Sequence, residues 1–251
     1  MSEYYTGRRT KNLFDPSRKE PFKLSRSKFE LFMNCPRCFY LDRRLGIGYP
    51  PGFPFTLNSA VDKLLKKEFD SYRAREVRHP LMEKYGINAV PFKHVMMDHW
   101  RNALKGGMEY LHKETNLLLT GAIDDAWVAP NKKLFIVDYK STSKEKEVTL
   151  DADWQKSYKR QMEIYQWLFR RNDFDVSPTG YFLYCNGNTD KASFDARLDF
   201  DIKIIPYQGD DSWIENKILE MHKCLTSPTI PDYTDECDYC TYNKAMKEVN
   251  G

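Results

Sequence analysis

The chain has 251 residues, enough for one sizeable domain or two small ones. Its five Trp, 16 Tyr and 15 Phe exclude disorder over the whole length, because so many aromatic side chains need a core. The net charge of +3 is too small to indicate a nucleic-acid partner, but residues 1–50 carry 11 basic and five acidic side chains, and residues 190–251 carry seven and 13. The basic start can attract either the acidic end or a phosphate backbone.

No apolar run approaches the roughly 18 residues of a membrane-spanning helix, and the first residues lack the apolar stretch of a signal peptide. We therefore expect a cytoplasmic protein with no membrane partner. In that compartment cysteines are thiols or metal ligands rather than disulfides. The six cysteines are Cys35, Cys38, Cys185, Cys224, Cys237 and Cys240.

The first part of the chain predicts helices after a polar, basic arm over residues 1–22. Ser27 and Glu30 have the spacing of a capping box, and Pro36 suits the first position of a helix. The expected helices are one that opens at Ser27, one from Pro36 to about Leu45, and two over 57–72 and 94–104, which follow a Pro- and Gly-rich loop at 48–55.

After residue 107 the pattern becomes strand-like. The expected elements are strands over 108–114, 117–128 and 134–141, a helix over 153–171, strands over 179–185 and 196–205, and a helix from a second capping box at Ser212 to about Leu225.

This order of elements predicts a mixed α/β fold with its sheet in the middle of the chain. We expect a basic flexible arm over 1–22 and a single domain over 23–251. The parts of that domain are a helical region over 23–107, a sheet core with a crossover helix over 108–206, and a C-terminal helix with a Cys-x-x-Cys tail over 207–251.

One group of residues has the chemistry of phosphodiester hydrolysis. Gly121 and Asp124 have a Gly-x-x-Asp spacing, and the apolar strand that follows ends in Asp138-Tyr139-Lys140. Side chains alternate along a strand, so Asp138 and Lys140 point to the same face. Two carboxylates are hard oxygen ligands for Mg²⁺, and a lysine can orient water or stabilise charge on the phosphate. The alternative for Asp-x-Lys alone is a salt bridge on a solvated sheet face.

A second group lies on the helix expected after that strand. Gln161 and Tyr165 are four residues apart and therefore share a helix face. Trp154 and Tyr158 continue the same stripe. Taken alone, an aromatic stripe indicates core packing; next to an Asp-x-Lys strand it indicates a site.

The order Gly-x-x-Asp, Asp-x-Lys, Gln-x-x-x-Tyr resembles the PD-(D/E)XK nuclease superfamily, and most closely its RecB-like branch. That branch includes the AddB nuclease domain and the CRISPR-associated RecB-like exonucleases. The resemblance extends from about Leu24 to Cys240 and implies a restriction-endonuclease-like core, with a central mixed sheet flanked by helices and an N-terminal helical region. It also implies that Asp124 and Asp138 bind Mg²⁺ or Mn²⁺ and that Lys140 is catalytic.

In this resemblance Gln161 and Tyr165 belong to a substrate-facing helix, and the cations that flank them, Lys156, Lys159 and Arg160, are expected to contact DNA. The implied activity is a metal-dependent deoxyribonuclease, an exonuclease rather than an endonuclease, acting on single-stranded DNA or duplex ends in repair, recombination or defence. The alternatives are a catalytically inactive nucleic-acid-binding or scaffold protein on the same fold, and a purely structural zinc protein.

Two departures from the family pattern concern metal ligands. The family has a His on the helix before the sheet, and here Asp62 stands at the matching position. Asp62 is either a substituted Mg²⁺ ligand or a solvated helix residue. The RecB-like nucleases also hold a [4Fe-4S] cluster with one upstream cysteine and three downstream cysteines.

Here the downstream part contains only Cys237 and Cys240, and Cys38 offers a replacement one helical turn from Cys35. Two Cys-x-x-Cys pairs make a complete set for a [4Fe-4S] cluster or for Zn²⁺. The alternative is four unrelated buried thiols. Cys185 and Cys224 are expected to be core residues.

A shared metal also requires a particular strand register. Asp124 and Asp138 must lie on one sheet face, which an antiparallel hairpin allows through an odd loop or through a bulge that restores the same parity. The two share a face when they directly oppose each other. That register centres the turn on Asn131, with a three-residue loop Pro130–Lys132 and Ala129 opposite Lys133. Such a loop usually needs a left-handed residue at its end, here without a Gly.

Overall fold

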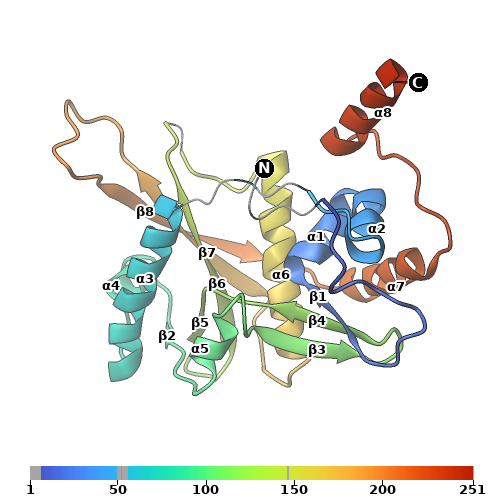
Figure 1. The fold of residues 1–251 in the computed structure, drawn as a ribbon. Helices are drawn as coiled ribbons and strands as arrows, with labels where there is room; N and C mark the ends of the chain where they lie inside the picture. The colour runs from blue at the N-terminus through green and yellow to red at the C-terminus, as the bar shows by residue number, and fades with distance from the viewer. Residues whose placement is uncertain (1–6, 50–51, 53–55, 146, 251) are drawn as a thin grey trace. The chain divides into compact units, whose positions relative to one another are not determined.

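A computed structural model describes residues 7–49, 52, 56–145 and 147–250 (Figure 1). The chain divides into two compact units. The terminal unit combines residues 1–53, 109–120 and 212–251, and the sheet unit combines residues 54–108 and 121–211. The loop expected over 48–55 lies mostly outside the described residues.

The sheet unit contains a five-stranded mixed sheet of order β2-β5-β6-β7-β8. Its strands are β2 (Val90–Pro91), β5 (Asp125–Val128), β6 (Leu134–Thr142), β7 (Thr179–Gly187) and β8 (Phe200–Gln208). Its helices are α3 (Thr56–Arg75), α4 (Pro80–Lys84), α5 (Met97–Trp100), the 3-10 turn η1 (Asp153–Gln155) and α6 (Lys156–Arg170).

The two long helices of this unit cover opposite faces of strand β6 (Figure 1). Phe69 of α3 lies against Trp127 and Tyr139, with ring centroids 5.6 and 5.8 Å apart. On the other face α6 connects β6 to its parallel neighbour β7, because a parallel pair cannot be joined by a tight turn. This confirms the expected mixed α/β fold with a crossover helix.

The terminal unit contains a second sheet, which the sequence did not lead us to expect. Its order is β1-β4-β3, and β1 runs parallel to β4. The elements are β1 (Phe22–Ser25), α1 (Arg26–Asn34), α2 (Pro36–Arg44), β3 (Met108–His112), β4 (Leu117–Gly121), α7 (Ile214–Thr226) and α8 (Asp238–Asn250).

The basic segment before β1 makes specific contacts within the terminal unit. Phe14 is buried, and its N–H donates to the carbonyl of Arg43 at 2.8 Å. The guanidinium of Arg9 pairs with Asp42 at 2.8 Å. From Arg9 to Phe14 the segment is therefore held by burial and hydrogen bonds, where the sequence predicted a flexible arm.

Several predicted boundaries are wrong. The helix expected over 94–104 is only the four-residue α5, and the strand expected over 117–128 is interrupted at 122–124. The interruption arises because the N–H of Ile123 donates to the carbonyl of Trp100 rather than to a neighbouring strand. Both expected capping boxes are offset from the helix starts: α1 begins at Arg26 after Ser25, and α7 begins at Ile214 after Trp213. The short elements α4 and β2 and the terminal helix α8 were missed.

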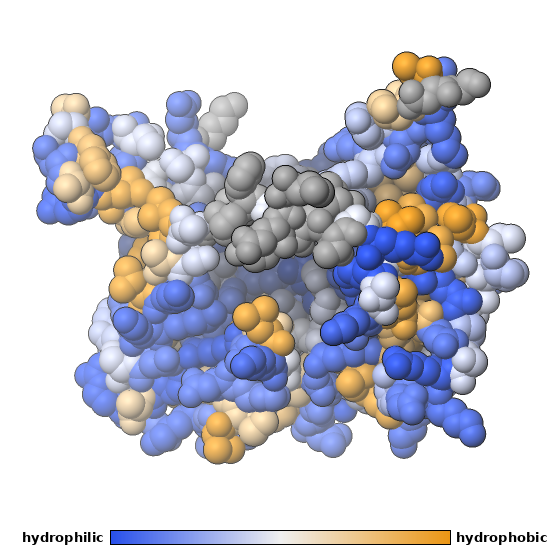
Figure 2. Space-filling view, in the orientation of Figure 1, coloured by the Kyte–Doolittle hydropathy of each residue, from blue (hydrophilic) through white to orange (hydrophobic). Residues whose placement is uncertain are grey.

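The face shown in Figure 2 is predominantly hydrophilic, with hydrophobic side chains gathered over the hairpin of β7 and β8. Within the described ranges, no helix has both the length and the apolar character needed to cross a bilayer.

Candidate active site and metal centre

The hairpin of β5 and β6 has the register that a shared metal requires. Asp125 opposes Val137, and the pairing continues to Val128 opposite Leu134. The N–H of Ala129 then donates to the carbonyl of Lys133 at 2.9 Å, which closes a three-residue loop. Lys132, at the end of this loop, has φ +70°. The predicted odd loop and its left-handed residue are confirmed.

Continued by one residue, this register places Asp124 opposite Asp138. The next residue of a regular ladder, Ile123, turns away to Trp100, which leaves the N–H of Tyr139 without its usual carbonyl. The Asp124 carboxylate replaces that carbonyl and accepts the Tyr139 N–H at 2.9 Å. Asp124 is thereby fixed against the residue that separates Asp138 from Lys140.

Asp138 is fully buried and contacts Lys140 and Gln161 on the α6 side of the sheet. The Lys140 ammonium forms an ion pair with it, and the Gln161 amide donates to its Oδ1 at 2.7 Å. The same amide also lies 3.2 Å from the hydroxyl of Tyr165. The Asp-x-Lys strand and the Gln-x-x-x-Tyr helix therefore form one hydrogen-bonded group.

The close approach of α6 explains why the Gly-x-x-Asp pattern begins with a glycine, Gly121. A Cβ at this position would lie 2.7 Å from the Tyr165 ring and 2.9 Å from Leu168. Any side chain larger than hydrogen would displace α6 or its Tyr165. Gly121 thus allows the helix that carries Gln161 to lie close to the hairpin that carries Asp138.

Asp62 lies on α3, where a lysine links it to Asp124. The Lys66 ammonium is 2.8 Å from Asp62 and 3.4 Å from Asp124. Burial opposes the charge on Lys66, but the two carboxylates outweigh burial and raise its pKa above the ordinary value. The pair of carboxylates therefore already holds one cation.

These donors suit a hard divalent ion, because carboxylate oxygens are the ligands that Mg²⁺ prefers. Within the described part of the chain, however, the ligand atoms of Asp62, Asp124 and Asp138 do not all lie within 4.8 Å of one another. The ammonium groups of Lys66 and Lys140 lie against these carboxylates instead. Asp124 and Asp138 fit the role of metal ligands by chemistry and by register, with Asp62 as a third candidate.

A family model described as the PD-(D/E)XK nuclease superfamily matches residues 23–245, which is most of the chain. The chain belongs to the PD-(D/E)XK nuclease superfamily. Membership indicates metal-dependent nuclease activity on a nucleic acid. A solved structure titled "Crystal structure of SSO0001" is 16% identical to it over 90% of this chain and 86% of that chain, with a TM-score of 0.36. No curated protein matches the chain.

On the α3 side, the hairpin of β5 and β6 packs against buried charged residues that the sequence did not lead us to expect. Asp125 is fully buried and accepts hydrogen bonds from Arg73 at 2.6 Å, from Arg101 at 2.9 Å and from the Tyr139 hydroxyl at 2.8 Å. Burial and the Asp125 charge raise the pKa of Tyr139 well above its ordinary value, so Tyr139 stays a donor. The signal was the Asp124-Asp125 doublet, whose second carboxylate must face the α3 side together with Tyr139.

The basic residues expected to contact DNA lie on α6 of the nuclease. Lys156 is exposed and pairs with Asp153 at 2.9 Å, and the Lys159 ammonium lies 5.8 Å from the centre of the Tyr207 ring. Arg160 directly precedes Gln161, the first buried residue of the helix. None of these contacts involves the Asp138 carboxylate.

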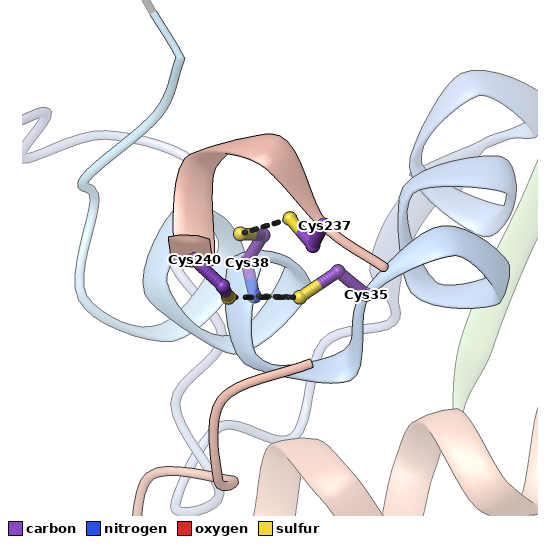
Figure 3. Close-up of side chains that lie close together, drawn as sticks. All are labelled: Cys35, Cys38, Cys237 and Cys240. Atoms are coloured by element: carbon purple, nitrogen blue, oxygen red, sulfur yellow. Dashed lines mark hydrogen bonds between the residues drawn. The ribbon is translucent and has the colours of Figure 1, made fainter. Parts of the chain in front are cut away.

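The four expected cysteines of the terminal unit converge (Figure 3). Cys35 and Cys38 come from the start of α2, and Cys237 and Cys240 from the start of α8. All four are buried, and their sulfurs lie within 4.8 Å of one another. The Cys35–Cys240 and Cys38–Cys237 sulfur distances are 3.6 and 3.7 Å. Within the described residues this is the one group of three or more His, Cys, Asp or Glu that is so close.

Cys35 is the N-cap of α2, and its sulfur accepts the N–H of Cys38 at 3.4 Å. Burial opposes its ionisation, but the hydrogen bonds with Thr234 and the Cys38 amide outweigh burial and lower the pKa of Cys35 to about 7. Burial raises the pKa of Cys38 and of Cys240. The prediction that Cys185 is a core residue is confirmed, whereas Cys224 is only half-buried.

Proposed function

We propose that this chain is a RecB-like deoxyribonuclease that uses Mg²⁺ or Mn²⁺ and removes nucleotides from DNA ends, in repair, recombination or defence. The observation that carries this proposal is the group in which Gln161 binds Asp138, Lys140 pairs with Asp138, and Asp124 binds the intervening Tyr139 amide. The order of these motifs along the chain supports the RecB-like branch. The basic residues of α6 support a polyanionic substrate.

Asp124 and Asp138 would hold the divalent ion, which when bound would supply an activated water and neutralise charge on the phosphate. Gln161 keeps the Asp138 carboxylate in one orientation by donating to Oδ1. Lys140 presents a positive charge beside that carboxylate, where it can orient the attacking water or stabilise the negative charge that develops on the phosphate.

The test uses end-labelled single-stranded and duplex DNA, with matching RNA, in Mg²⁺, Mn²⁺ or EDTA. We expect metal-dependent shortening of DNA from its ends, and loss of about a hundredfold or more in rate for Lys140→Ala. The matched control is Lys133→Ala, which removes a half-exposed lysine from the other end of the same strand region. Cleavage by Lys140→Ala at the wild-type rate would refute the assignment, and internal cuts would refute the exonuclease part of it.

One observation favours the alternative of a nucleic-acid-binding protein without catalysis. Lys66 neutralises both Asp62 and Asp124, as a side chain would in a site that no longer binds metal. Titration of the purified protein with Mn²⁺ separates the two functions, because only the nuclease requires a divalent ion at these carboxylates. Tight DNA binding with no Mn²⁺ binding would favour the alternative.

For the cysteine group we propose a single tetrahedral Zn²⁺ rather than a [4Fe-4S] cluster. Four thiolates on one Zn²⁺, at the usual Zn–S distance, lie about 3.8 Å apart. The observed sulfur distances of 3.6 and 3.7 Å agree with that value. Thiolates of a [4Fe-4S] cluster bind four different irons and therefore lie farther apart.

A further inference from the structure

Trp154 is an exposed aromatic residue that the proposed chemistry does not use. All five tryptophans lie in the described part of the chain, and Trp154, at 52%, is the exposed one. It belongs to η1, directly before α6. An indole left in water forgoes a large favourable burial energy, so its position calls for an explanation other than the packing of the core.

The turn that carries Trp154 is firmly held. Gln155 is 1% exposed, and its side chain accepts the N–H of Ala152 at 2.9 Å and donates to the carbonyl of Thr149 at 2.5 Å. A buried amide thus fixes the turn on both sides. Trp154 is therefore presented to solvent by a built turn.

The indole belongs to a row of rings and ammonium groups. The ring centroids of Trp154 and Tyr158 are 5.3 Å apart in an edge-to-face arrangement. The ammonium of Lys144 lies 4.6 Å from the centroid of the Trp154 ring, and that of Lys140 lies 4.4 Å from the centroid of the Tyr158 ring. We call these four residues the aromatic row.

The aromatic row ends at the catalytic group, because its Lys140 is the lysine that pairs with Asp138. The backbone of Lys144 is held by Asn186, since its N–H donates to Asn186 at 2.8 Å and its carbonyl accepts from Asn186 at 3.0 Å. Aromatic faces combined with nearby cations are the features with which proteins hold unpaired bases and the phosphates between them.

We infer that the aromatic row is a stacking site for an unpaired nucleobase next to the phosphate that is cut, so that the preferred substrate is single-stranded DNA. The base stacks on Trp154 while Lys144 binds a neighbouring phosphate. Bases inside a duplex already stack on each other and cannot use the indole, which makes the row selective for single strands. This inference rests on the proposed nuclease function and adds the substrate class.

The test measures the anisotropy of a labelled 20-nucleotide oligothymidylate and of a labelled blunt 20-base-pair duplex, without added divalent metal. Loss of one stacked base weakens binding about fivefold or more. We expect that loss for Trp154→Ala on the oligothymidylate, near wild-type binding for Trp154→Phe, and unchanged binding of the duplex by both. The control is Phe194→Ala, which removes an aromatic residue that is 73% exposed in the loop before β8.

Unchanged oligothymidylate binding by Trp154→Ala would overturn the inference, and so would an equal loss for both DNAs. Equal melting temperatures of wild type and Trp154→Ala show that the variant is folded. If the wild type cleaves DNA and Trp154→Ala binds normally, the stacking site is refuted and the nuclease function stands. If binding depends on Trp154 but the wild type does not cleave, the nuclease function is refuted and the stacking site stands.

Discussion

The Asp124 carboxylate accepts the backbone N–H of Tyr139, the residue between Asp138 and Lys140, at 2.9 Å. A side chain here completes the ladder at the point where β5 leaves β6. Because the bond is to backbone, the position of Asp124 depends on the register of the hairpin. The geometry of the site therefore depends on the loop that sets this register.

Lys132→Gly should stabilise the protein by about 0.5–1 kcal/mol, because the φ of +70° at this position is unfavourable for a residue with a Cβ. The variant should cleave at the wild-type rate, since the register is unchanged. Urea unfolding measures the stability. The contrasting variant is Asn131→Ala, which loses the bond from the Lys133 N–H to the Asn131 side chain at 3.2 Å and should be destabilised. A destabilised Lys132→Gly would contradict the proposed source of strain.

Gly121→Ala should impair cleavage strongly, because the added methyl group would lie 2.7 Å from the Tyr165 ring and push Gln161 away from Asp138. We expect destabilisation of about 1–3 kcal/mol as well. The control is Gly187→Ala, whose methyl group would have the flexible side chain of Leu198 as its nearest neighbour, at 3.3 Å. If Gly121→Ala cleaves and melts as the wild type does, the close approach of α6 is not needed.

The hairpin could be predicted because its register depends on local rules. Side chains alternate along a strand, so the requirement that Asp124 and Asp138 share a face is enough to determine an odd loop length. Likewise Pro36 marks the start of α2, because proline lacks the N–H that the first helical position does not use. Both inferences need only neighbouring residues.

The strand boundary at Ile123 and the network of Asp125 were not predicted because they depend on long-range contacts. Nothing local indicates that Ile123 bonds to Trp100 and so interrupts the strand. The buried network of Asp125 with Arg73 and Arg101 joins three separate elements, and charged residues are ordinarily taken as exposed. The roles of Asp62 and of the aromatic row likewise depend on which side chains the fold places nearby.

Removing the zinc proposed for the cysteine group should destabilise the protein strongly. Cys38 and Cys237 are 199 positions apart, and a metal that closes so long a loop contributes on the order of 5 kcal/mol by chain entropy. Cys237→Ser should therefore melt far below the wild type. Elemental analysis of colourless protein should give one zinc per chain.

The control for this variant is Cys224→Ser, which changes a half-buried cysteine outside the group and should keep the zinc. A strong chelator should lower the melting temperature of the wild type and of Cys224→Ser, and have little further effect on Cys237→Ser. Brown protein that contains iron would show that the group holds an iron–sulfur cluster and not zinc. Colourless protein without metal would show that the four cysteines are buried thiols and not metal ligands.

Asp42 should make the stability of the terminal unit dependent on pH. Burial raises the pKa of this carboxyl, but Arg43 at 2.7 Å and Lys28 at 2.9 Å outweigh burial and hold the pKa below its ordinary value. A lowered pKa stabilises the fold above the unfolded value of about 3.9, and this contribution is lost as the pH falls through the folded value.

Asp42→Asn should therefore cost about 3 kcal/mol at pH 7, where the buried Arg43 loses its partner, and less at pH 3, where the loss of this contribution has begun. Urea unfolding at both pH values gives the two differences from wild type. Asp151→Asn, which changes an exposed carboxylate, should differ little from wild type at either pH. An Asp42→Asn difference that is the same at both pH values would show that charge is not its cause.

Asp62 tests whether the carboxylate that stands in place of the family histidine binds metal. Asp62→Ala should weaken Mn²⁺ binding about tenfold or more, whereas Asp62→His should retain it, because both carboxylate and imidazole can bind the ion. Isothermal titration gives the affinities. Glu76→Gln, which changes an exposed carboxylate just after α3, should bind as the wild type does.

Lys66 complicates Asp62→Ala, because an ammonium that loses Asp62 at 2.8 Å can pair more closely with Asp124 and compete with the ion. The double variant Asp62→Ala, Lys66→Met removes that competition. If Asp62 is a ligand, the double variant stays weak; if Lys66 alone caused the loss, the affinity returns to the wild-type value. Wild-type affinity in Asp62→Ala itself would make Asp62 a solvated helix residue whose partner is Lys66.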